Sequence, residues 1–561
     1  MEVRSGGRGG GKKRRRKKRL VVYQSCHAAR RDSLKGHAAR RDSLKGRATS
    51  NGTTPLGVAP HDSLKSLVVL LFFLAAVRLA TPRSRAEKLL SKLPTPPLRL
   101  PVIGHLHLVG PLPHRSLREL ARRHGPDVLL LRLGAVPTLV ISSPRAAKAI
   151  LRTHDNVFLS RPFSAVADVL FYGTTDVGFA PYGEYWRQAR KVVTTHLLTV
   201  RKVRSGRAAR EQEVRLALAR VRDAAAARAA VDLSEIFSFF ANDVVCQAVT
   251  GRLPREQGRN ELFHDLLVTN NTELLGGFNL DEYFPSLARL NVVPAKAAKH
   301  RKRWDDLLDG LIDKHASKTV SGEHEEEDFI DVLLSVQQEY SLTRDNIKAI
   351  LMDMFEAGTD TTSISLDFAM AQLIRNPKAM AKLQAEVRRC ASRKGKHEIF
   401  TEDDLSTMSY LKAVMKEAMR LHPPASFMIP HSSMAECEVE GYTIPSGVRV
   451  LLNVWALGRD PACWESAEEF MPERFLEEAM DAASDLQGND FRLLPFGSGR
   501  RMCPAVKFAT ATFEIILANL IYHFNWELPP GTTGVDMTET FGINVHRKER
   551  LRLVPCVAHG V

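Results

Sequence analysis

The chain has 561 residues, of which 44% are hydrophobic and 25% are charged, a balance that excludes a wholly disordered protein. Its seven cysteines are scattered and lack Cys-x-x-Cys spacing, which excludes a disulfide framework and a zinc ribbon and indicates a reducing compartment. The net charge of +17 is concentrated at the N-terminus, because residues 1–60 hold 17 Lys and Arg against three acidic residues, or +14.

Residues 1–60 form a basic, low-complexity segment that we expect to be a disordered extension. Residues Lys12–Arg19 are eight consecutive cations, and the decapeptide His27–Gly36 is repeated as His37–Gly46. Such a segment cannot bury a core. Nucleic-acid binding or nuclear import is one alternative. We expect instead a solvated tail, or an extension that an erroneous gene model has joined to the rest, and no specific nucleic-acid partner.

Residues 61–81 are predicted to form an N-terminal membrane anchor helix. Its uncharged stretch Leu67–Val77 has 11 residues and would span about 17 Å, against a hydrocarbon layer of ~30 Å. Counting residues 64–80, with the two flanking cations snorkelling, lengthens the span to about 25 Å. The helix is therefore a marginal anchor, and whether it spans the membrane or only embeds in it stays open.

Residues 82–100 are predicted to be a basic, proline-rich hinge, which includes the run Leu93-Pro94-Thr95-Pro96-Pro97. The domain that carries the chemistry is expected to follow at residues 101–561.

A Trp-x-x-x-Arg pattern, Trp186 to Arg190, is the first motif of this domain. Residues four apart share one face of a helix. An indole N–H and a guanidinium are both hydrogen-bond donors, so this face suits an anionic group.

A long helix is predicted between Thr343, an N-cap residue, and the stop signal Asn376-Pro377. Its 34 residues from Thr343 to Asn376 would span roughly 50 Å. Gly358 and the threonines that follow it weaken the middle of the helix, because hydroxyl groups can bond back to helix carbonyls. We expect a groove there that admits small molecules.

The segment Lys416–Pro424 predicts a second helix, in which Glu417 and Arg420 lie three residues apart on one face before two prolines. At a protein surface such an ion pair would contribute little.

The stretch Phe496–Ala505 contains Cys503 in a glycine-rich turn. Gly497 and Gly499 permit a tight backbone that could bring the sulfur under a metal, and Arg501 could pair with a carboxylate. A lone cysteine is more often a small core residue, but the flanking pattern favours a haem-thiolate loop, in which the thiolate promotes O–O cleavage.

Together these motifs resemble the cytochrome P450 family. The family loop Phe-x-x-Gly-x-Arg-x-Cys-x-Gly is matched by Phe496, Gly499, Arg501 and Cys503, with Ala505 in place of the last glycine. The resemblance covers the chain from about Pro94 to its end, and its details are similar to the plant A-type group, above all to grass enzymes of specialised and defence metabolism.

The resemblance implies a mainly α fold with small β-sheets, a single large helical haem domain preceded by a membrane anchor. It implies haem b as the cofactor, with Cys503 as the axial ligand of the iron. The family's other positions fall on cofactor-binding residues and on a structural triad under the haem loop: Trp186, Arg190, His431, Phe496 and Arg501 for the cofactor, and Glu417, Arg420 and Arg474 for the triad. For His431, a solvated loop histidine is an equal alternative.

Asp360 and Thr361 match the family's catalytic acid and alcohol, which supply protons during oxygen activation. The alternative is a polar helix face on which Thr361 bonds only to its own backbone.

Phe427, Met428 and Phe541 are expected to line the substrate pocket, since their segments are apolar and lie near the distal face in the family. They suit a hydrophobic small molecule, although apolar loop residues are more often core packing.

The expected function is that of a monooxygenase, which inserts one oxygen atom from O2 into a hydrophobic small molecule. Indole-type plant metabolites are one candidate substrate class, while relatives in the family act on terpenoids and oximes. The alternatives are a haem-thiolate isomerase or dehydratase acting on an oxime or peroxide, and a non-catalytic haem protein.

Electrons are expected from an NADPH-dependent flavoprotein reductase, because the chain has no flavin domain of its own. A basic surface could meet it, formed by Arg187, Arg190, Lys191, Arg201, Lys202 and Arg204. The resemblance places the protein in the endoplasmic reticulum membrane, with the catalytic domain facing the cytosol.

Overall fold

The computed structural model describes residues 84–251, 262–263, 265–267, 274–277, 279–321, 327–392, 398–476 and 486–558. The chain divides into two units, residues 1–80 and 81–561, and every described residue belongs to the second. The expectations for the basic extension at 1–60 and the anchor at 61–81 therefore lie outside the described residues.

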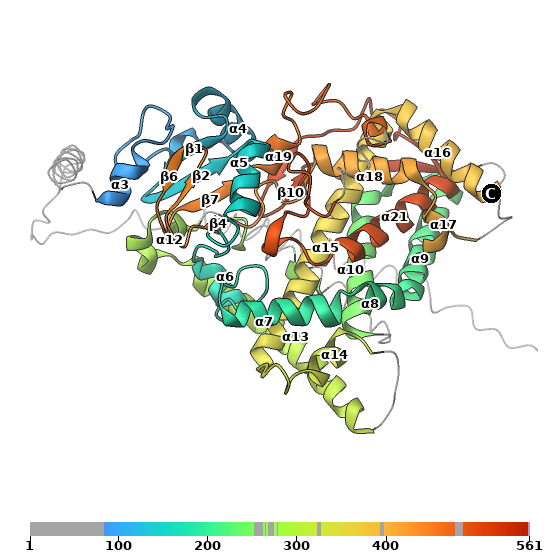
Figure 1. Ribbon diagram of the computed structural model, residues 1–561. Coiled ribbons are helices and arrows are strands. Elements are labelled where there is room, and N and C mark those ends of the chain that lie inside the picture. The colour runs from blue at the N-terminus through green and yellow to red at the C-terminus, as the bar shows by residue number, and fades with distance from the viewer. Residues whose placement is uncertain are drawn as a thin grey trace, which may run out of the picture. The chain divides into compact units, whose positions relative to one another are not determined.

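Helices make up most of the described chain and surround one long central helix, α15 (Figure 1). In chain order the α-helices are α3 (Arg85–Leu90), α4 (Pro113–His124), α5 (Pro144–Lys148), α6 (Ala165–Leu170), α7 (Glu184–Val192), α8 (Val200–Ser205), α9 (Arg207–Ala226), α10 (Leu233–Thr250), α12 (Leu280–Tyr283), α13 (Val293–Ser321), α14 (Phe329–Ser335), α15 (Arg344–Arg375), α16 (Pro377–Ser392), α17 (Glu402–Leu405), α18 (Ser409–Leu421), α19 (Val454–Leu457) and α21 (Val506–His523). Short 3-10 or π turns are η1 (Leu106–Leu108), η2 (Ala149–Thr153), η3 (Val193–Leu197), η5 (Pro285–Leu290), η6 (Pro472–Phe475) and η7 (Gly499–Arg501).

Helix α15 begins and ends where the sequence predicts. Thr343 and Asn346 form a capping box at its start, with hydrogen bonds of 3.1 and 2.9 Å between each side chain and the other's backbone N–H. The helix stops at Asn376, because Pro377 cannot continue its ladder.

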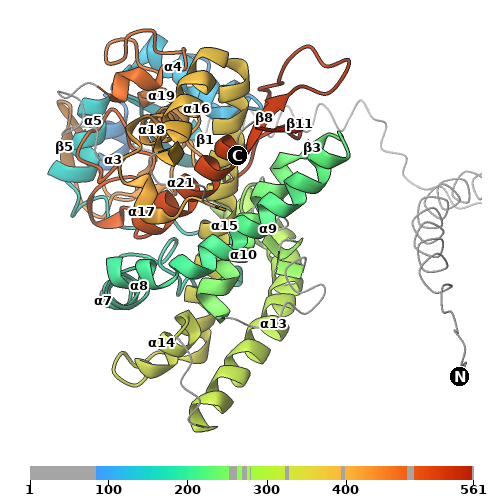
Figure 2. The ribbon, with the colours of Figure 1, turned by 90° about the vertical axis from the view of Figure 1, so that its right-hand side faces the viewer.

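Helix α10 packs along α15, as Figures 1 and 2 show. A Cβ at Gly358 would lie 2.8 Å from Cγ2 of Val245 on α10. Gly358 therefore lets the two helices approach closely, in addition to any loosening of the helix by the neighbouring threonines.

The described residues also form four small sheets. The largest has the order β1-β2-β7-β4 and lies with α3, α4 and α5 on one side of the molecule (Figure 1). Its strands are β1 (Val128–Leu133), β2 (Val136–Ile141), β7 (Arg449–Leu452) and β4 (His431–Ser432), and the other sheets pair β3 (Val231–Asp232), β11 (Arg552–Val557) and β8 (Phe524–Glu527), β5 (Cys437–Val439) with β6 (Tyr442–Ile444), and β9 (Glu539–Phe541) with β10 (Val545–Arg547).

The described part of the expected hinge, from residue 84 to 100, packs against the domain. Ser84 caps α3, and Leu90 and Leu93 are buried in the core beneath the largest sheet. The carbonyl oxygen of Pro94 accepts a hydrogen bond of 2.8 Å from the backbone of Leu130 on β1. These residues therefore form a docked entry into the domain.

Candidate active site

A cavity of about 310 Å³ lies between the middle of α15, helix α7, the Cys503 loop and the segment before α7. Its walls are mainly apolar, and Cys503 and Thr361 are both among the residues that line them. A pocket with apolar walls and a few convergent polar groups is the usual form of a small-molecule site.

Cys503 lies between η7 and the start of α21. Its backbone N–H donates to the carbonyl of Phe496 at 2.8 Å, and its sulfur accepts from the N–H of Ala505 at 3.4 Å. Burial raises the pKa of the Cys503 thiol. A metal bound to the sulfur would instead lower the pKa of this thiol, because a coordinating thiol loses its proton.

Gly499 is required by the shape of this loop. Its φ is +70°, and a Cβ there would lie 2.4 Å from the carbonyl oxygen of Leu151 and 2.8 Å from Oδ1 of Asp155. A larger residue would have to displace the backbone that holds Cys503.

One end of the cavity is cationic. Arg501 donates to the carbonyls of Leu159, Val177 and Ala180 at 2.8, 3.2 and 2.7 Å, and its guanidinium lies 4.1 Å from the centroid of the Trp186 ring. Burial lowers the pKa of Arg501 to about 10, so the group stays charged at neutral pH.

Trp186 and Arg190 of α7 line the same end. The indole N–H of Trp186 donates to the carbonyl of Val177 at 3.1 Å, and Arg190 donates to the carbonyl of Met502 at 2.5 Å. The predicted cofactor-binding side chains on α7 and on the Cys503 loop are therefore brought together.

Arg161 is a third cavity arginine, which the sequence motifs did not identify. It donates to the carbonyls of Gly178 at 3.0 Å, Ile429 at 2.6 Å and Pro430 at 3.1 Å. Among the residues that the structure describes, Arg161, Arg190 and Arg501 form no ion pair. A cavity end with three such cations would be balanced by an anionic ligand.

His431, on β4, is buried at the cavity wall. Its Nδ1 donates to the carbonyl of Phe158 at 2.7 Å. Burial, and then the charge of Arg161, hold the pKa of His431 well below its ordinary value. The neutral ring then offers an acceptor at Nε2, and it would donate to an anion only after gaining a proton.

The acid and alcohol predicted on α15 separate in the structure. Thr361 lines the cavity, and its hydroxyl donates to the carbonyl of Ala357 at 2.5 Å, so its catalytic role stays a prediction. The carboxylate of Asp360 is outside the lining, because it accepts from Nδ2 of Asn544 at 2.6 Å and lies 3.4 Å from Nε2 of His546.

Two other carboxylic acids on α15, Asp353 and Glu356, line the cavity. One oxygen of Asp353 accepts from the backbone N–H groups of Val177 and Gly178 at 2.5 and 3.4 Å. The motif search missed both acids because it stopped at the residues next to Thr361, although a helix returns to the same face every three or four residues.

Of the three predicted substrate-pocket residues, Met428 lies at the cavity wall and Phe427 and Phe541 do not. The rings of Phe427 and Phe541 pack edge to face with centroids 6.1 Å apart, outside the lining. The loop conformation explains the difference, since Met428 has a φ of +55° and turns toward the cavity. Ile543, two residues after Phe541, also lines the wall.

The predicted triad forms a buried network away from the cavity lining. Arg420 meets the two oxygens of Glu417 at 2.7 and 2.8 Å, and Arg474 meets one of them at 3.2 Å. Glu417 has no exposed surface and Arg420 has 1%. The network ties α18 to the segment that carries η6.

The family model described as Cytochrome P450 matches residues 94–553. The chain belongs to the cytochrome P450 family. Among the similar curated proteins, indole-2-monooxygenase from Zea mays is 56% identical over 512 residues, covering 88% of this chain and 95% of the relative. Indolin-2-one monooxygenase from Zea mays is 50% identical over 519 residues, covering 90% of this chain and 97% of the relative.

The fold agrees with solved cytochrome P450 structures. A zebra fish cytochrome P450 with abiraterone has a TM-score of 0.67 at 23% identity, and the match covers 80% of this chain and all of that one. The prediction of a plant A-type P450 monooxygenase with a mainly helical haem domain is confirmed.

This P450 uses haem b, O2 and electrons derived from NADPH through a reductase. The cavity residues fit a haem: Cys503 offers a sulfur at the wall, and the cationic end suits two propionates. Cys503 would hold the iron, and Arg190 and Arg501 would hold the propionates, whereas the single indole N–H of Trp186 already donates to the carbonyl of Val177. Bound there, the haem supplies the activation of O2.

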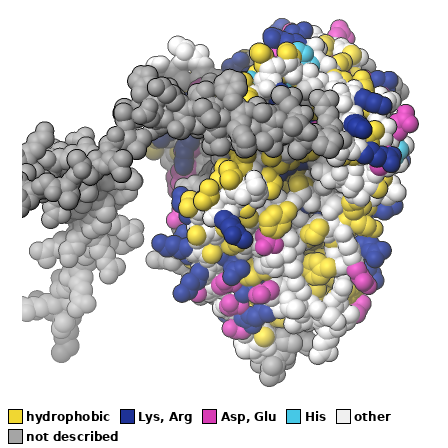
Figure 3. All heavy atoms as spheres, turned by 90° about the vertical axis from the view of Figure 1, so that its left-hand side faces the viewer, with side chains coloured by type: hydrophobic (Ala, Val, Ile, Leu, Met, Phe, Trp, Pro, Cys, Tyr) yellow, Lys and Arg dark blue, Asp and Glu magenta, His cyan; other side chains and the backbone are white. Residues whose placement is uncertain are grey.

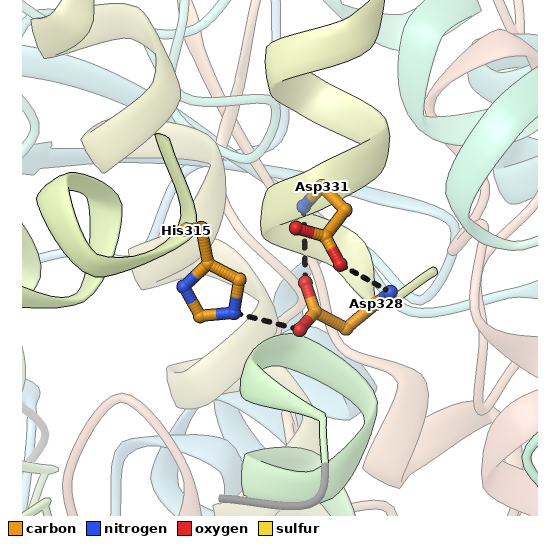
Figure 4. A group of neighbouring side chains, drawn as sticks. All are labelled: His315, Asp328 and Asp331. Carbon is orange, nitrogen blue, oxygen red and sulfur yellow. Dashed lines mark hydrogen bonds and ion pairs between the residues drawn. The ribbon is translucent and has the colours of Figure 1, made fainter. Parts of the chain in front are cut away.

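A second cluster of titratable groups, His315, Asp328 and Asp331, lies at the junction of α13 and α14 (Figure 4). His315 Nε2 lies 2.8 Å from Asp328, and Asp328 and Asp331 form the capping box of α14. These groups are already bonded to one another and to helix ends, which indicates a structural connection between the helices.

Within the described ranges, no helix is both long enough and apolar enough to cross a membrane.

Proposed function

We propose that this P450 hydroxylates an apolar, indole-type small molecule. The observation that carries the proposal is the placement of Cys503 and Thr361 on the walls of one mainly apolar cavity. Relatives that are 50% to 56% identical are named for monooxygenation of indole and indolin-2-one, which supports a flat, benzo-fused nitrogen heterocycle as the substrate.

The chain's own residues would orient the substrate, exclude water from the cavity and supply protons. The apolar walls exclude water and hold a flat substrate by shape, while Thr361 offers a neutral hydroxyl for proton transfer. Glu356 reaches the cavity from one turn earlier on the same helix and is a nearer source of protons for the cavity than Asp360.

The reductase would dock on the basic face formed by α7 and α8. Arg187, Lys191, Arg201 and Arg204 are exposed there, whereas Arg190 faces the cavity and leaves this predicted surface. An acidic partner would be attracted to such a surface and its affinity would fall with ionic strength.

We also propose that the protein is held at the endoplasmic reticulum membrane, with this domain facing the cytosol. An exposed apolar face supports the proposal: Leu98, Leu290 and Val292 are 74%, 69% and 67% exposed. The β1–β2 turn joins their segments, since Gly134 bonds to Ile103 and the next residue bonds to Tyr283. Hydrophobic side chains gather on this side of the molecule (Figure 3).

The test of the substrate class is reconstitution of the full-length holoenzyme with an NADPH-dependent reductase, followed by incubation with indole or indolin-2-one under ¹⁸O2. We expect a product that carries one ¹⁸O atom. Absence of an ¹⁸O-labelled product from both compounds would contradict the substrate class, and turnover of an oxime or peroxide without reductase would support the isomerase or dehydratase alternative. The membrane proposal predicts that the full chain stays with microsomes after alkaline extraction, and release would contradict it.

A further inference from the structure

The segment Thr175–Ala180 forms part of the cavity wall and also contacts the side chains of the cationic end. It lies between α6 and α7 and contributes three of the lining residues. Its backbone carbonyls accept hydrogen bonds from Trp186 at 3.1 Å, Arg161 at 3.0 Å and Arg501 at 3.2 and 2.7 Å. The position of this segment therefore affects both the substrate wall and the cationic end.

Two carboxyl groups hold the N–H side of the same segment. Asp353 Oδ2 accepts from the backbone of Val177 at 2.5 Å and of Gly178 at 3.4 Å. Asp176 Oδ2 accepts from the backbone of Phe179 at 2.6 Å. Three successive N–H groups are thus satisfied by acids that lie 177 positions apart in the sequence.

The two carboxyl groups flank Gly178. A Cβ at Gly178 would lie 3.3 Å from Asp176 Oδ2 and 3.4 Å from Asp353 Oδ1. Asp176 has no exposed surface, and its Oδ1 has no hydrogen-bond partner among the described residues. A buried carboxylate oxygen without a donor is costly, so two ionised carboxylates on either side of Gly178 would be unfavourable.

The surroundings favour one proton for the pair. The charged and titratable groups that face it are Arg161, Arg501, Glu356 and Tyr185. Burial, and then the charge of Asp176, raise the pKa of Asp353 well above its ordinary value. Burial also raises the pKa of Asp176, to about 6, against the two arginines that favour its ionised form. Both shifts therefore favour one proton on the pair over two negative charges.

We propose that Asp353 and Asp176 share one proton and, in that state, clamp the segment Thr175–Ala180 to α15, which makes them positioning residues for the cavity. This inference goes beyond the proposed function, since it does not depend on the identity of the substrate.

A neutral Asp353 can act as the clamp because its carbonyl oxygen still accepts the two N–H groups. Full ionisation would place two negative charges side by side in a buried site and would push the segment away from α15. Asparagine has the same shape as a protonated aspartic acid, so Asp353→Asn should preserve the clamp and remove its proton.

The test is hydrogen exchange, followed by mass spectrometry, on the full-length holoenzyme and its variants at neutral pH. In Asp353→Ala, exchange protection of the amides of residues 177–179 should fall about tenfold, as expected from the loss of two hydrogen bonds. Asp353→Asn should keep that protection. Asp345→Asn, at the exposed start of the same helix, is the matched control and should change nothing in this segment.

Equal loss of protection in Asp353→Asn and Asp353→Ala would overturn the proposal, because an ionised clamp would need the charge. Infrared spectra give a second readout. The wild-type spectrum minus that of Asp353→Asn or Asp353→Ala should show a protonated-carboxyl C=O band at neutral pH. Absence of this difference band would also contradict a shared proton. Neither readout requires turnover, so failure of the proposed activity would leave this test intact.

Discussion

Two groups of buried arginines differ in what balances their charge. Arg420 and Arg474 both pair with the carboxylate of Glu417, so each has an anionic partner within the chain. Arg161, Arg190 and Arg501 at the cavity donate to backbone carbonyls and, in the described part of the chain, to no carboxylate. The first group stabilises the scaffold by itself, whereas the second leaves positive charge for an anionic ligand.

The largest expected effect comes from removing the Glu417 carboxylate that pairs with Arg420 and Arg474. Glu417→Ala would leave Arg420 buried and unpaired, at a cost of about 3–5 kcal/mol in the free energy of unfolding. Urea unfolding monitored by circular dichroism measures it. Glu119→Ala removes an exposed carboxylate that also pairs with two arginines, and it should leave the midpoint unchanged. Similar midpoints for the two variants would contradict the comparison.

Removal of a cavity arginine should act on the cofactor more than on the fold. Arg501→Gln would remove a charged donor worth about 1.5–3 kcal/mol to an anion, so we expect haem release about tenfold to a hundredfold faster. Transfer of haem to an excess of an apo-haem protein measures the rate.

The control for this prediction is Arg500→Gln, because Arg500 is exposed and pairs with Asp155 outside the cavity lining. It should release haem at the wild-type rate. If Arg501→Gln instead lowered stability as much as Glu417→Ala and kept its haem, the two arginine groups would not differ as described.

Substitutions at Thr361 and Asp360 should differ in their effect on product formation, although the two residues are adjacent. Thr361→Ala removes the hydroxyl at the cavity wall. The amount of product formed per NADPH oxidised should therefore fall about tenfold or more. Thr361→Ser should restore most of it. Asp360→Asn should have the smaller effect, because this side chain lies against Asn544 and His546. A stronger loss in Asp360→Asn than in Thr361→Ala would contradict this difference, because it would identify Asp360 as the main proton source.

The acid pair beside the cavity predicts a smaller, pH-dependent effect. Because the pKa values of Asp353 and Asp176 are raised in the folded state, the folded state binds more protons than the unfolded chain. Stability should therefore decline as the pH rises from about 4 through the folded-state pKa values, with part of the loss near the Asp176 pKa of about 6. Urea midpoints across this range should decline less steeply in Asp353→Asn. An unchanged slope would exclude the pair as the cause.

Local signals in the sequence predicted the elements whose cause is local. Thr343 and Pro377 mark the ends of α15, and Gly499 is needed by the turn that presents Cys503. The pairing of Glu417 with Arg420 also follows from helix spacing.

The parts that could not be predicted depend on long-range packing. Arg161 reaches the carbonyls of residues 429 and 430, and Asp353 reaches the backbone of Val177. No sequence spacing brings such groups together. The same holds for the pocket, where the backbone at Met428 decides which neighbouring side chain faces the cavity.

The proposed chemistry requires that Cys503 binds a haem iron as a thiolate. The most direct measurement is the difference spectrum of the reduced holoenzyme with and without carbon monoxide, recorded for the wild type and for Cys503→Ser. We expect the red-shifted Soret band of a thiolate-ligated carbonyl haem in the wild type and its absence in Cys503→Ser. A wild-type protein that folds without this band, or a variant that keeps it, would contradict the assignment.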